Sequence, residues 1–235
     1  VLEVPTADPH EGWACADLHL HGFVPGDASE HALGTLLEIE GLDAAAFVDW
    51  AGRVEGAPRS EHWGGFAWTE EELSRRESTG GALLLRAQAW ARPERTCAMH
   101  VFGHRTPVAG ISKHSRARIV ATAQSEGGWV SGALGRIFVE GALRGDVAAS
   151  EVLSLGRFHR LDEWYDLLNV GARIGAIAGT DAQFGARPQT IVDYHAPLGA
   201  NRVCVAIEDA EADAGAGGEV GQAQLFAALQ AGHSY

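Results

Sequence analysis

Two histidines near the start of the chain have a spacing that suits metal binding. His19 and His21 are separated by one residue in the run Asp17-Leu18-His19-Leu20-His21. Side chains on a β-strand alternate between its two faces, so both imidazoles would lie on the same face. Two imidazole nitrogens that converge from one strand can supply half of a metal site. An exposed strand can carry the same pair, so the metal hypothesis requires further ligands.

A third candidate ligand lies near the other end of the chain. Asp181 follows an apolar run that begins at Ile174, and it comes directly after Gly179 and Thr180. The glycine would allow a close approach of the backbone, although Asp at such a place is also a common turn residue. Two His and one Asp are a common ligand set for Zn²⁺, Mn²⁺ or Fe²⁺ that leaves a position for water. A cation held in this way lowers the pKa of its bound water, so hydroxide forms near neutral pH.

The length and composition suit one α/β domain. The 235 residues suit a single barrel, and a hydrophobic fraction of 46% allows a sizeable core. The net charge of −13 argues against nucleic acids and anionic membranes as partners. No apolar run approaches a membrane span and no signal peptide is visible, so we expect a soluble protein, either cytoplasmic or exported after removal of a leader. Oligomeric state, and whether native sequence is missing at either end, stay open.

The cysteines give no sign of a disulfide framework. Cys15, Cys97 and Cys204 are widely spaced and form no C-x-x-C motif. Because their number is odd, at least one thiol is left unpaired, and the sequence predicts no framework of disulfides.

Strand and helix signals alternate along the chain. The patterns predict strands over residues 15–20, 44–48, 82–90, 98–102, 174–178 and 202–207, and helices between Ser29 and Gly41 and over residues 116–124, 161–170 and 222–230. Such alternation favours βαβ units and a mostly parallel sheet. The distance in sequence between the paired histidines and Asp181 suggests a barrel whose first and last strands meet at one mouth.

Polar residues that follow other strands are further candidates for the site. In a βα barrel, polar side chains at the C-terminal strand ends face the active site. The candidates of this kind are Asp49, Gln88, His100 and His104. The Gly- and Trp-rich segment 51–81, which includes His62, is too polar for a core; it indicates either a lid over a pocket or a surface excursion. Trp50 could line a pocket or serve in the core.

Two parts of the chain resemble a known family. The H-x-H strand, followed by Glu40-Gly41-Leu42-Asp43 and a strand that ends at Asp49, resembles the opening of the PHP (polymerase and histidinol phosphatase) domain. The stretch 163–171 and Ala178-Gly179-Thr180-Asp181 look like one branch, the CehA/McbA-like metallohydrolases. The resemblance implies a single PHP-type domain over residues 1–235, with a distorted TIM-like (β/α) barrel. It also implies metal-dependent hydrolysis of amide, ester or phosphoester bonds.

The chain departs from the family pattern at several ligand positions. Trp50 and Gln183 stand where the family has His, the family's bridging Glu falls on the strand of Gln88, and a further family His falls near His100. The metal ligands that the resemblance implies are therefore His19, His21 and Asp181, with His100 as an additional candidate. One or two divalent cations are expected in place of the family's three.

Two functions are compatible with these features. The first is a metal-dependent hydrolase with a reduced site, in which Asp49 or His104 moves protons. Its substrate pocket would be lined by Trp50, Gln88, Gln183 and His62. The second is a catalytically inactive PHP-like binding module, because several family ligands have been replaced and a fold alone does not guarantee chemistry. The metal content of the purified protein distinguishes the two.

Overall fold

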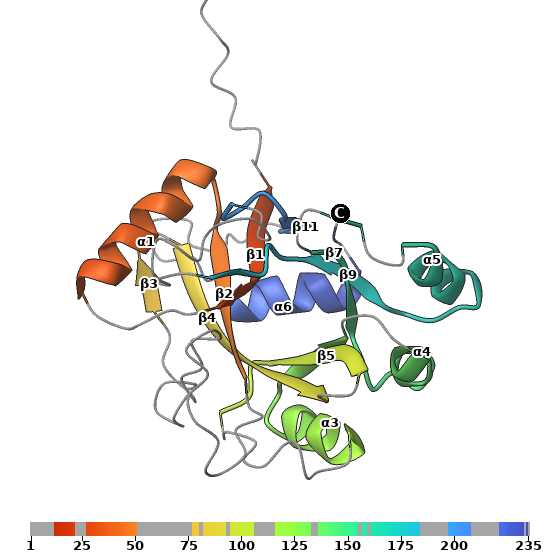
Figure 1. The fold of residues 1–235 in the computed structure, drawn as a ribbon. Helices are drawn as coiled ribbons and strands as arrows, with labels where there is room; N and C mark the ends of the chain where they lie inside the picture. The colour runs from red at the N-terminus through yellow and green to blue at the C-terminus, as the bar shows by residue number, and fades with distance from the viewer. Residues whose placement is uncertain are drawn as a thin grey trace, which may run out of the picture.

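A β-sheet that nearly closes into a barrel organises the chain (Figure 1). The computed structural model describes residues 12–21, 27–50, 77–79, 82–92, 95–105, 116–132, 136–154, 157–158, 161–183, 197–207, 221–232 and 234. Its strands are β1 (Trp13–His21), β2 (Ala44–Trp50), β3 (Glu77–Thr79), β4 (Ala82–Arg92), β5 (Arg95–Phe102), β6 (Trp129–Gly132), β7 (Ala149–Ser154), β8 (Arg157–Phe158), β9 (Gly175–Ala178), β10 (Ala182–Gln183) and β11 (Val203–Ala206). Its helices are α1 (Asp27–Glu40), α3 (Arg116–Ser125), α4 (Arg136–Leu143), α5 (Leu161–Asn169) and α6 (Gln222–Ala231).

The barrel closes where the chain passes from β9 to β10. The sheet follows the order β10-β1-β2-β4-β5-β6-β7-β8, and β9 pairs with β7. Because β9 is parallel to β7 and β10 is parallel to β1, one short stretch of chain connects the two ends of the sheet. At this seam the amide of Asp181 donates to the carbonyl oxygen of His19 at 2.7 Å. The early histidine strand and the late aspartate therefore meet at one place.

The prediction of an α/β barrel is confirmed, but the sheet is mixed rather than mostly parallel. Of the ten strand pairings within the described residues, five are parallel and five are antiparallel. Only two residues separate β4 from β5, which is enough for a hairpin and too few for a crossover between parallel strands. The expectation of mostly parallel strands was based on helical signals elsewhere in the sequence and did not take this short connection into account.

Hydrophobic clusters cover both faces of the barrel strands. The inner cluster includes Leu18, Ala87 and Phe102, and it packs against Leu225 and Leu229 of α6. An outer cluster joins β1, β2 and β4 to α1, and another joins β5 and β6 to α3. Figure 1 shows α6 (blue) at the centre of the view, framed by strands, with α1, α3, α4 and α5 around the edge. Among the described helices, none is both long and apolar enough to cross a membrane.

A disulfide connects β1 to β11, a pairing that the cysteine spacing did not indicate. Cys15 and Cys204 are opposite each other in the antiparallel pairing of these strands, and their sulfurs are bonded. The two residues are 189 positions apart in sequence, so only the strand pairing brings them together. The bond ties the strand that carries the two histidines to a strand from the far end of the chain.

Candidate metal centre

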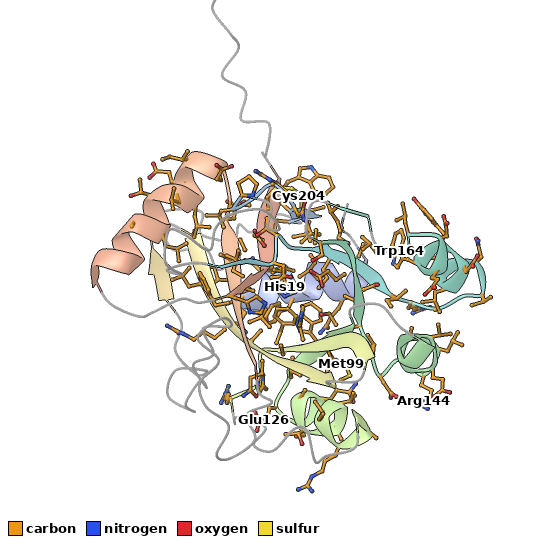
Figure 2. All side chains as sticks on the ribbon, viewed as in Figure 1. His19, Met99, Glu126, Arg144, Trp164 and Cys204 are labelled. Atoms are coloured by element: carbon orange, nitrogen blue, oxygen red, sulfur yellow. A yellow bond between two sulfur atoms is a disulfide. The ribbon has the colours of Figure 1, made fainter. Side chains whose placement is uncertain are left out.

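The end of β1 places both histidines on one side of the strand, inside the barrel. The Nε2 atoms of His19 and His21 lie 3.0 Å apart, and both side chains are buried. The pairing of β1 with β2 shifts register between Asp17 and Leu20, so the strand is irregular at the first histidine. Figure 2 shows His19 near the centre of the molecule, in a dense group of side chains enclosed by the strands.

The other ring nitrogen of each histidine is held by a hydrogen-bond acceptor. His21 Nδ1 lies 2.6 Å from the carbonyl oxygen of Val48 in β2, and an oxygen of this kind can only accept, so Nδ1 carries the proton. His19 Nδ1 lies 2.7 Å from Oε1 of Glu151 in β7. In their neutral forms both rings therefore present the Nε2 lone pair, which is the arrangement that supports metal-binding histidines in proteins.

Asp181 completes a group of three potential ligands. Its Oδ1 atom lies 3.0 Å from Nε2 of His21 and 3.4 Å from Nε2 of His19. The three atoms form one of the two groups in the described part of the chain that could hold a metal ion. The structure thus brings together the three residues that the sequence singled out, although their role as ligands stays a prediction.

The charges of this group favour a cation. Burial by itself lowers the pKa of His19, but the carboxylates of Glu151 and Asp181 outweigh burial and raise it to about 9. Burial raises the pKa of Glu151, and the charge and hydrogen bond of His19 outweigh this and lower it. Without a metal, the site therefore holds a proton on His19 between two carboxylates. A divalent cation at Nε2 would take the place of that proton.

Glu151 is the site residue that the sequence analysis missed. It lies in the middle of β7 and is only 2% exposed. A buried carboxylate requires a partner, and here the partner is the imidazole of His19. The available signal was a single charged residue within the otherwise small and apolar run from Ala149 to Leu153.

His100 lies beside the group, against the ring of His19. The two ring centroids are 4.3 Å apart, and the side chain of His100 is fully buried. Among the described residues, neither ring nitrogen of His100 has a hydrogen-bond partner, nor does Oγ of Ser131, the residue opposite it in β6. Burial, reinforced by the charge of His19, lowers the pKa of His100 to about 3, so the ring is neutral. His100 forms the second potential metal group, with His19 and Glu151.

Gln88 and His104 are brought to each other rather than to the three-ligand group. His104 Nε2 donates to Oε1 of Gln88 at 2.7 Å. Because Ala87 and Ala89 belong to the inner cluster and strand residues alternate, Gln88 points to the opposite face of β4. Burial lowers the pKa of His104 to about 4, so this ring is neutral at pH 7. The sequence analysis expected Gln88 and His104 to face the site together with the other strand-end residues. Their placement does not agree with that expectation.

The other predicted site residues are placed only in part. Asp49 and Trp50 end β2, and the backbone of Gln183 lies opposite His21 in the pairing of β1 with β10. The side chains of these three residues lie outside the described part of the structure. His62 and the proposed lid up to residue 76 also lie outside the described residues. Their roles stay predictions.

Comparisons with known proteins bear on the fold. No protein-family model and no curated protein matches the sequence. The structure is similar to the crystal structure of a two-domain protein from Bacteroides vulgatus that contains a predicted PHP-like metal-dependent phosphoesterase, with a TM-score of 0.59 and 12% identity. This similarity shows a shared fold. The match covers 94% of this chain and 64% of that chain, so this chain spans about two thirds of the length of its neighbour.

A second solved structure is less similar. It belongs to a protein from Bifidobacterium adolescentis whose assignment as a metal-dependent phosphoesterase is itself a prediction. The TM-score is 0.44 at 14% identity, and the match covers 74% of this chain and 89% of that one. This similarity is too low to add to the argument. At 12% identity, the first comparison supports the fold alone, and the chemistry follows from the site.

Proposed function

We propose that the protein is a metal-dependent hydrolase that holds a divalent cation with Nε2 of His19, Nε2 of His21 and the carboxylate of Asp181. One observation carries the proposal: both Nδ1 atoms are held by acceptors while both Nε2 atoms lie within 3.4 Å of one partly buried carboxylate oxygen of Asp181. Two imidazoles and one carboxylate suit Zn²⁺, Mn²⁺ or Fe²⁺.

The chemistry divides between the cation and the surrounding residues. When bound, the cation would polarise a carbonyl or phosphoryl oxygen and lower the pKa of a bound water, and three protein ligands leave a position for that water. Glu151 keeps the proton of His19 on Nδ1 and fixes the orientation of the ring. The carbonyl of Val48 does the same for His21. Asp49, which ends the neighbouring strand β2, stays only a sequence-based candidate for proton transfer, because its backbone pairs in register with that of Gln88, whose side chain points away from the three-ligand group.

The proposed substrates are small molecules with an amide, ester or phosphoester bond. The net charge of −13 disfavours nucleic acids and anionic membrane surfaces. Phosphoesters come first, because the neighbour from Bacteroides vulgatus contains a predicted PHP-like metal-dependent phosphoesterase. The motifs at residues 163–171 and 178–181 support the narrower proposal of a CehA/McbA-like enzyme, for which amides and esters would be the better substrates.

Metal content and hydrolysis together test this function. The protein would be purified from medium supplemented with Zn²⁺, Mn²⁺ and Fe²⁺, and its metal content measured by elemental analysis. We expect about one ion per chain, its loss in His19→Ala and Asp181→Ala, and its retention in Arg144→Ala, which alters an exposed ion pair. Activity would be measured with p-nitrophenyl phosphate, bis(p-nitrophenyl) phosphate, p-nitrophenyl acetate and acetyl-p-nitroanilide. A folded protein that takes up none of the three metals contradicts the proposal.

One observation favours the alternative of an inactive binding module. The inner face of β4 presents Ala87 and Ala89, so this strand offers no bridging carboxylate to a second cation. A protein that binds a metal but hydrolyses none of these substrates would agree with the module. A screen of small molecules for an increase in melting temperature would then identify its ligand.

A further inference from the structure

The carboxylate of Asp17 joins three segments at the seam of the barrel. Its Oδ1 accepts from the amides of Thr180 at 3.0 Å and of His19 at 3.3 Å. Its Oδ2 accepts from the hydroxyl of Thr180 at 2.7 Å and from the amide of Gly199 at 3.2 Å. Asp17 and Thr180 are both fully buried, and a buried carboxylate requires such donors to be tolerated. Residues 163 positions apart are thereby held together.

The segment that Asp17 holds has an unusual backbone. Asp181 has a φ of +55°, and it is the one non-glycine residue with a positive φ in the described part of the chain. This left-handed conformation is unfavourable for residues with a Cβ atom and persists only where the surroundings enforce it. Here Asn201 Nδ2 donates to the carbonyl of Gly179 at 2.9 Å, and the amide of Asp181 donates to His19. The bonds of Thr180 to Asp17 complete this restraint.

We propose that Asp17 and Thr180 form a latch that positions His19 and Asp181 as a matched pair of metal ligands. The role of the latch depends on the proposed function, in which His19 and Asp181 bind a metal. The carboxylate of Asp17 binds the backbone amide of His19 and also binds Thr180, the residue directly before Asp181. This one carboxylate therefore fixes the distance between the two ligands, His19 and Asp181. Asp17 and Thr180 are positioning residues: in this structure their polar atoms bind each other, while the Asp181 carboxylate meets the Nε2 atoms of the histidines.

Substitutions of Thr180 test the latch with little change in volume. Thr180→Val removes the hydroxyl donor to Asp17 and keeps the shape of the side chain, whereas Thr180→Ser keeps the hydroxyl. Ser234→Ala is the matched control, because its hydroxyl likewise donates a hydrogen bond, here to the carbonyl of Ala176 in β9, and does not touch the latch. Asn201→Ala, which releases the carbonyl of Gly179, is a second variant in case Thr180→Val does not fold.

Two measurements give a result for each variant. Titration of the metal-free protein with Zn²⁺ should show a 10- to 100-fold weaker affinity in Thr180→Val. The affinity of Thr180→Ser and of Ser234→Ala should stay within threefold of wild type. Asn201→Ala should weaken binding about threefold to tenfold. The visible absorption of bound Co²⁺, which reports coordination geometry, should change in Thr180→Val and return in Thr180→Ser. Hydrogen exchange of the Asp181 amide in the metal-free protein should accelerate at least tenfold in Thr180→Val.

The outcomes separate the latch from the metal site. Wild-type protein that binds neither Zn²⁺ nor Co²⁺ contradicts the proposed function, and the latch as a device for metal binding falls with it. Wild-type protein that binds Zn²⁺, together with a folded Thr180→Val that binds equally well with the same Co²⁺ spectrum, overturns the latch alone. Equal losses in Thr180→Ser or in Ser234→Ala would also overturn it, because the effect would then not come from the hydroxyl bond to Asp17.

Discussion

Replacing Gly179 with Ala should separate the two halves of the metal site. A Cβ atom at this position would lie 2.3 Å from Cβ, 2.6 Å from the amide nitrogen and 2.9 Å from Cα of His19. Ordinary contacts of a Cβ begin at 3.4 Å. Because all three atoms belong to or adjoin the backbone of β1, no side-chain rotation relieves the overlap. The seam must open, and the bond from the Asp181 amide to the carbonyl of His19 must stretch or break.

The size of the effect follows from this geometry. Opening the seam by about 1 Å would take the 2.7 Å bond of Asp181 beyond the range of a hydrogen bond. Overpacking of this kind costs about 1–3 kcal/mol, and the loss of one buried hydrogen bond adds roughly 1 kcal/mol. The free energy of unfolding of the metal-free protein should therefore fall by about 2–4 kcal/mol. Displacement of Asp181 relative to His19 should weaken metal binding about 10- to 100-fold.

Gly175→Ala is the control for a purely structural effect. A Cβ at Gly175 would lie 2.4 Å from the carbonyl oxygen of Leu229, so it overpacks the same strand β9 at its other end. Urea unfolding in the presence of EDTA should show comparable losses of stability for the two variants. Zn²⁺ titration of the folded proteins should show weaker binding for Gly179→Ala alone. Wild-type affinity in Gly179→Ala, or an equal loss of affinity in Gly175→Ala, would refute the reasoning.

Four further predictions concern the charges and the disulfide. Glu151→Gln should lower Zn²⁺ affinity about 10- to 100-fold in titrations, because the residue that binds Nδ1 of His19 is then uncharged. Unchanged affinity would show that Glu151 does not orient the His19 ring. Since the pKa of His19 is raised to about 9, Zn²⁺ must displace a proton below that pH, and the apparent affinity should rise by about tenfold per unit between pH 6 and 8. Because the pKa of His19 is about 6.5 in the unfolded state and about 9 in the folded state, the metal-free protein should lose stability in EDTA melts as the pH rises from about 6.5 to 9. A flat profile over this range would contradict the raised pKa of His19. Cys15→Ser should lower the free energy of unfolding by up to about 5 kcal/mol under oxidising conditions, because the disulfide restricts the unfolded chain by closing a loop across 189 residues. A reductant should abolish the difference between the variant and the wild type.

Local patterns in the sequence were enough to find the three-ligand group. The period of two along a strand places His19 and His21 on one face whatever the fold around them. Gly179 before Asp181 indicated a close approach of two backbones, and the structure shows that a Cβ there would overlap His19. The alternation of strands and helices was enough for the α/β barrel. These features depend on neighbouring residues, whose geometry the backbone dictates.

Only the tertiary structure decided which distant residues meet. Glu151 reaches His19 across 132 positions, and Cys15 reaches Cys204 across 189. The pairing of Gln88 with His104 on the far face of β4 likewise depends on strand direction, which the hairpin from β4 to β5 reverses. In a nearly closed barrel, strand register and the meeting of the sheet's two ends fix all of these contacts at once, and no local spacing encodes them. The sequence by itself therefore determined the candidate ligands, and barrel closure determined what surrounds and supports them.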